Sequence, residues 1–172
     1  SSDLISVYEE RRADPTWGQS MNPAYREMIL GDDLTPISQL SGAFLNPRSG
    51  EHLQFAYYES SLVVEYLIDH YGLDVLKRIL VDLSVGMPIN EALARYTGSI
   101  ELLDHEFTEY VRKRANEFGA HVDWARPSKD ADLADWLRDH PDSFWALKLN
   151  AQRLIEAKQW QAAKAPLEQL IA

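Results

Sequence analysis

The sequence contains no cysteine among its 172 residues. Disulfide bonds, thiolate nucleophiles and cysteine-ligated zinc are therefore excluded for this chain. The cellular compartment stays open, because proteins of the bacterial cell envelope also often lack cysteine. The missing residue thus restricts the chemistry of the chain and not its location.

Long apolar runs are missing too, since no stretch approaches the ~20 residues that a membrane-spanning helix needs. We therefore expect no membrane insertion of this segment. Positive charge is scarce: Lys and Arg number 17 against 27 for Asp and Glu, which gives a net charge of -10. Because this charge repels a phosphate backbone, it argues against nucleic acid and favours a peptide or protein partner.

Strand patterns are absent as well, because no apolar alternation of period 2 lies between turn signals. Apolar residues recur instead at i, i+3 and i+4, which predicts an all-α fold, an antiparallel helical array followed by a helical hairpin. The segment 31–51 carries prolines and glycines and is predicted to be an ordered loop with one short helical turn. The helices of the array are predicted at 4–12, 23–30, 52–71, 76–83, 90–96 and 100–118.

Capping residues support several of these boundaries. Asn22 before a proline is typical of a helix start, and Asn90 and Ser99 are predicted to cap the two later helices. Gly72 is predicted to end the long helix. The buried stripe of that helix is predicted to contain Leu62, Val63, Tyr66 and Leu67.

A break in the helical pattern after residue 118 predicts two domains. Residues 1–118 form the helical array, and residues 119–129, with a proline and a charge cluster, are predicted to be a linker. Residues 130–172 are predicted to be a separate set of short helices.

One segment of the array pairs a tyrosine with a strongly amphipathic helix. Tyr57 is followed by the small residues Ser60 and Ser61, by Val-Glu-Tyr-Leu at 64–67 and by Gly72. This pattern resembles the Tyr-x-x-Ser-type helix of peptidase MA-like domains, which belong to the gluzincin zinc peptidases. The resemblance implies that Tyr57 is catalytic and donates a hydrogen bond to the oxyanion of the reaction. Without it, Tyr57 is most simply a core or interface tyrosine.

A second segment lies at the start of the chain. Residues 3–10, Asp-Leu-Ile-Ser-Val-Tyr-Glu-Glu, resemble the family segment in which Trp-Leu-x-Glu-Gly leads into a helix. The resemblance puts Asp3 in the position of the zinc-ligand glutamate, and Leu4 where the family has glycine. From the residues alone, Asp3 is a helix N-cap or a first-turn acid that complements the helix dipole.

Three later segments, at 80–86, 90–98 and 102–107, resemble sequence segments of peptidase MA-like domains and occur in the same order as in that family. The resemblance therefore spans about residues 3–114. The HExxH motif that holds the family's zinc does not occur in the chain, and its five histidines include no pair at i, i+4. The resemblance therefore implies zinc in a longer parent protein, and no zinc cofactor bound by this chain alone. On this interpretation the chain is an inactive fragment of a peptidase.

Residues 130–172 resemble one tetratricopeptide repeat (TPR). Ala151 and Ala163 are the small residues at which two helices touch, and Lys158 occupies the turn where the family usually has glycine. Leu167 and Leu170 are the closing apolar pair. The resemblance implies further repeats beyond residue 172, because one repeat cannot bury its own face. A generic helical hairpin is the alternative.

Two functions follow from these patterns. The chain supplies the helical wall of the substrate cleft of a zinc-dependent peptidase, together with a protein-binding repeat. Alternatively, it is a degenerate relative that has lost zinc ligation and serves as a scaffold joined to a protein-interaction module. Asp3 and Leu4, in place of Glu-Gly, favour the scaffold.

Overall fold

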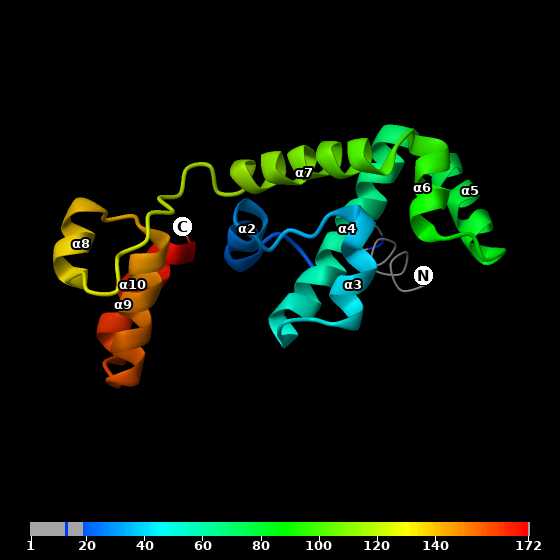
Figure 1. Cartoon of the computed structure of the whole chain (residues 1–172). Helices are drawn as coiled ribbons and strands as arrows, with labels where there is room; N and C mark the ends of the chain where they lie inside the picture. The colour runs from blue at the N-terminus through cyan, green and yellow to red at the C-terminus, as the bar shows by residue number, and fades with distance from the viewer. Residues whose placement is uncertain (1–12, 14–18, 172) are drawn as a thin grey trace. The chain divides into compact units, whose positions relative to one another are not determined.

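The computed structural model describes residue 13 and residues 19–171 (Figure 1). The chain divides into two compact units, a first unit of residues 1–118 and a second unit of residues 119–172. Within the described ranges the regular elements are all helices, and the only β-type pairing is an isolated bridge between Asp123 and Ser143. The prediction of an all-α fold is confirmed. No helix in these ranges has the length and apolar character needed to cross a bilayer.

Local sequence signals explain where the helices of the first unit begin. The Tyr25 backbone N–H donates to the Asn22 side chain at 2.9 Å, so Asn22 caps its helix as predicted. Ser49 and Ser99 cap two further helices in the same way. The described elements of this unit are α2 (Pro23–Leu30), the 3₁₀ helix η1 (Ile37–Gln39), α3 (Leu40–Leu45), α4 (Gly50–Tyr71), α5 (Leu73–Ser84), α6 (Ile89–Thr97) and α7 (Ile100–Glu117).

Helix α4 lies at the centre of the first unit and packs against α3, α5 and α7. The four residues of its predicted stripe are all buried, and Tyr58 on the same helix stacks on Tyr25 of α2 with ring centroids 4.9 Å apart. From α7, Leu103 and Phe107 complete the core. Burial of each such side chain stabilises the fold by roughly 1.5–3 kcal/mol, so this core holds α4 in a fixed position.

The segment 31–51 contains more helix than predicted. It forms η1 and α3 in succession, and α4 begins at Gly50, two residues before the predicted start, because Ser49 supplies the cap. The predicted cap at Asn90 is wrong. Helix α6 begins at Ile89 after Pro88, and the Asn90 side chain instead donates to the Ser38 carbonyl oxygen at 3.1 Å.

The second unit contains α8 (Leu133–Asp139), α9 (Phe144–Glu156) and α10 (Trp160–Ile171). Helices α9 and α10 pack together as a hairpin, and Ala151 and Ala163 are each 2% exposed. The segment 119–129 is bonded to the start of α9. The Phe144 N–H donates to the Asp123 carbonyl oxygen at 2.9 Å, and the Ser143 hydroxyl donates to the Ala125 carbonyl oxygen at 2.7 Å.

Helices α5 and α9 end in the same C-terminal hydrogen-bond pattern, a Schellman motif. After α5, Met87 N–H donates to Asp82 O at 3.1 Å, and the residue with positive φ is Gly86. After α9, Gln159 N–H donates to Leu154 O at 2.8 Å, and the residue with positive φ is Lys158, at 58°. The left-handed region is unfavourable for a residue with a Cβ atom, so the turn after α9 is strained where the turn after α5 is not.

We expect Lys158→Gly to raise the free energy of unfolding of the second unit by about 0.5–1 kcal/mol, because glycine adopts this φ without steric cost. Urea unfolding followed by circular dichroism measures the change. The matched control is Gly86→Lys, which should lower the stability of the first unit by about 1 kcal/mol, since a Cβ atom there meets nothing within 4 Å and only the backbone is strained. A destabilised Lys158→Gly variant would contradict the assignment of strain.

Candidate functional site

The N-terminal half of α4 carries three residues that face one hollow in the surface of the first unit. His52, Phe55 and Glu59 recur at intervals of three and four residues, so they share one face of the helix. Ser49 fixes the start of this helix. Its hydroxyl lies 2.7 Å from His52 Nδ1 and accepts the His52 backbone N–H at 3.3 Å. The Ser49 cap and the burial of Phe55 in the core together hold this face of α4 in place.

The other walls of the hollow come from the segment between α2 and α4. Asp33 and Thr35 lie before η1, and Gly42 and Ala43 on α3 present almost no side chain to the space. We call this space the α4 hollow; its volume is about 490 Å³, within the range of small-ligand pockets. It is lined by Asp33, Thr35, Gln39, Gly42, Ala43, Asn46, Pro47, Arg48, His52, Phe55 and Glu59.

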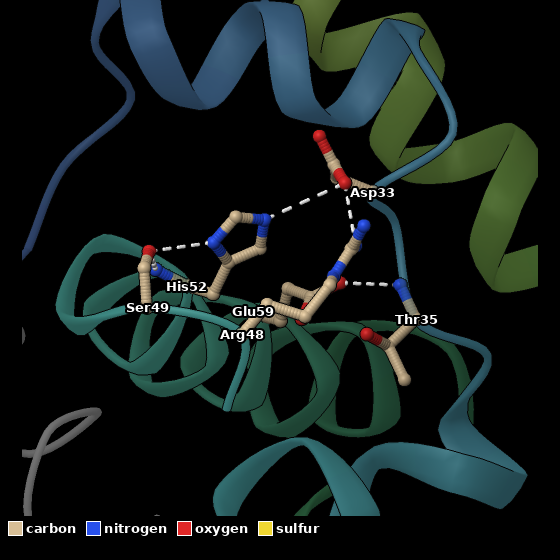
Figure 2. Close-up of polar contacts among 6 residues, drawn as sticks. All are labelled: Asp33, Thr35, Arg48, Ser49, His52 and Glu59. Atoms are coloured by element: carbon tan, nitrogen blue, oxygen red, sulfur yellow. Dashed lines mark hydrogen bonds and ion pairs between the residues drawn. The ribbon is translucent and has the colours of Figure 1, made fainter. Parts of the chain in front are cut away.

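Glu59 lies at the inner side of the α4 hollow and is only 1% exposed. Its Oε1 accepts the Thr35 backbone N–H at 2.7 Å, as Figure 2 shows. Burial raises the pKa of Glu59 to about 7, against the lowering effect of the Thr35 amide and hydroxyl, and the charge of Asp33 raises it further. A carboxyl group with a pKa near neutrality, beside a hollow, is typical of a functional site.

An ion-pair network lies at the rim of the hollow (Figure 2). Asp33 Oδ1 is 2.5 Å from the Arg48 guanidinium and 3.6 Å from His52 Nε2. Arg48 is 66% exposed, so solvent screens the pair and its contribution to stability is small, roughly 0–1 kcal/mol. The network therefore orients side chains around the opening of the hollow and contributes little to the stability of the fold.

Tyr57 does not line the α4 hollow. It lies two positions before Glu59, about 200° around the helix, and its half-buried ring contacts Phe44 edge-on with centroids 5.1 Å apart. Its hydroxyl has no hydrogen-bond partner in the part of the chain that the structure describes. The structure thus places the tyrosine and the buried carboxyl on different sides of α4.

Asp3 lies outside the described residues. Across residue 13 and residues 19–171, no group of three or more His, Asp or Glu side chains is arranged to hold a metal ion. His52, His70 and His140 belong to separate environments, against Asp33, the Tyr66 carbonyl oxygen and Asp123 respectively.

Glu59 and Asp33 were not among the site residues predicted from the sequence. The signal for Glu59 was its position seven residues after His52, on the helix face that also carries Phe55. The rest of this helix is buried along much of its length, so a charged residue on this face was unusual. A glutamate in such a position is buried or reaches an opening, and the sequence contains no information on which of these applies. Comparison of the chain with protein-family models, curated proteins and solved structures found no match.

Proposed function

We propose that this chain supplies the helical wall of the substrate cleft in a zinc-dependent peptidase of peptidase MA-like type, joined to a TPR-like hairpin that binds protein. The order of the sequence blocks between residues 3 and 114 supports the family. Since HExxH does not occur in these 172 residues, we propose that the zinc ligands lie elsewhere in the protein.

The observation that carries the proposal is the state of Tyr57. Tyr57 lies on α4, which the core holds in position, and its ring contacts Phe44 of α3. Its hydroxyl has no hydrogen-bond partner among the described residues. A pre-positioned hydroxyl of this kind is suited to donate a hydrogen bond to the oxyanion that develops on a peptide carbonyl. Tyr57 is therefore the proposed catalytic residue of this chain.

A second function is favoured by the residues at the start of the chain. Asp3 and Leu4 stand where the family has Glu-Gly, and the shorter aspartate reaches less far towards a metal ion. On this alternative the domain keeps the helical fold without hydrolytic activity, and it serves as a scaffold that holds the second unit near its partner.

Metal removal from the full-length protein distinguishes the two functions. If the peptidase proposal is right, the protein hydrolyses an unstructured substrate such as casein, and 1,10-phenanthroline abolishes the activity until zinc is added back. The non-chelating isomer 1,7-phenanthroline is the control and should have no effect. Absence of hydrolysis by a folded, zinc-supplemented protein would overturn the peptidase proposal and leave the scaffold.

A further inference from the structure

We propose that the α4 hollow binds a basic side chain, lysine or arginine, of a peptide, with the Glu59 carboxylate as its counter-ion. The hollow is separate from Tyr57, so this binding site does not depend on the peptidase proposal.

Glu59 has no cationic partner among the described residues. Among the described residues, Glu59 accepts hydrogen bonds from Thr35 and forms no salt bridge. Buried carboxylates are normally paired with a cation, because removing the charge from water is costly. A cation that enters the hollow would therefore meet a carboxylate whose charge is not yet balanced.

The charge of Arg48, which lines the hollow, is balanced by another residue. Its guanidinium is bound to Asp33, at 2.5 Å, and forms no ion pair with Glu59. Because Asp33 balances the charge of Arg48, the pair adds no net repulsion to an incoming cation. The amide side chains of Gln39 and Asn46 also line the space and offer oxygen acceptors to an ammonium or guanidinium group.

The shape of the hollow and the net charge of the chain also suit a basic side chain. Ala43 and Pro47 supply apolar surface for the hydrocarbon stem of a lysine or arginine, whose charged end then reaches Glu59. The volume of about 490 Å³ admits a whole side chain with its neighbouring backbone. The net charge of -10 attracts a basic peptide over a longer range.

The test compares two short peptides, acetylated and amidated at their ends, that differ only in lysine or norleucine at the central position and carry a neutral fluorophore. At pH 8 we expect the 172-residue chain to bind the lysine peptide about tenfold more tightly or better in fluorescence anisotropy, because a charge-assisted hydrogen bond replaces an apolar contact. Glu59→Gln should reduce this preference to less than about twofold, as expected when the buried charge is lost.

The matched control is Glu51→Gln, which removes the same charge from an exposed position of the same helix and should leave the preference intact. Equal affinity of the wild-type chain for both peptides would overturn the proposal, as would an unchanged preference in Glu59→Gln. If butylammonium alone binds saturably while the two peptides are not distinguished, the hollow is a site for small amines and the assignment to a peptide is wrong.

Discussion

We expect Glu59→Gln to raise the free energy of unfolding at pH 8 by about 3 kcal/mol, the value that corresponds to a carboxyl pKa raised from 4.5 to about 7. The glutamine keeps the shape of the side chain and an oxygen that can accept the Thr35 N–H. It removes the cost of holding an ionised carboxylate in a position that is 1% exposed. We therefore expect the variant to be more stable than the wild type at alkaline pH.

The sign of the pH dependence follows from the direction of the shift. Below pH 4.5, Glu59 is protonated in both the folded and the unfolded chain, so the substitution changes stability little. As pH rises from 4.5 to about 7, the unfolded chain releases this proton before the folded chain does, and the wild type loses stability. Above this range the loss is complete, and the difference between variant and wild type is largest.

Urea unfolding of both proteins at pH 4.5 and pH 8, followed by circular dichroism, measures the difference. Glu51→Gln is the control, because its carboxyl is exposed and its replacement should give nearly the same small change at both pH values. A Glu59→Gln variant that is less stable than the wild type at pH 8 would show that the carboxylate itself stabilises the segment around Thr35.

Tyr57→Phe is expected to lower the kcat of the full-length protein by about 10²-fold, the usual cost of losing one oxyanion donor. KM should change little, because the hydroxyl acts on the charge that develops in the transition state. The free energy of unfolding should be nearly unchanged as well. The phenylalanine keeps the edge-on contact with Phe44, and the lost hydroxyl has no partner among the described residues.

Tyr71→Phe is the matched control for this measurement. Tyr71 lies at the opposite end of α4 and its hydroxyl is 3.4 Å from a Glu106 oxygen, so its removal should not alter kcat. Steady-state kinetics on a peptide substrate, with unfolding curves for each variant, separates catalysis from stability. Unchanged turnover in Tyr57→Phe would remove this tyrosine from the proposed mechanism.

The helices of this protein could be predicted because helix formation depends on neighbours within about one turn. The cap at Asn22, the end of α4 at Gly72 and the apolar stripe of α4 were all visible as short patterns, and the structure agrees with each of them. Where two local signals competed, prediction failed. Pro88 precedes Asn90 and starts α6 one residue earlier, so the asparagine is inside the helix and bonds to Ser38 instead.

The α4 hollow could not be predicted in this way, because it joins residues that are far apart in the chain. Glu59 meets Thr35 across 24 positions, and Asp33 meets Arg48 across 15. The depth of burial that raises the Glu59 pKa depends on how α3 and the segment that carries Thr35 fold over α4. The sequence by itself determined the helical class, the caps at Asn22 and Ser99 and the excess of negative charge, since these depend on composition and near neighbours. Only the tertiary structure decided which carboxyl group is buried beside an open space, because burial depends on contacts between distant segments.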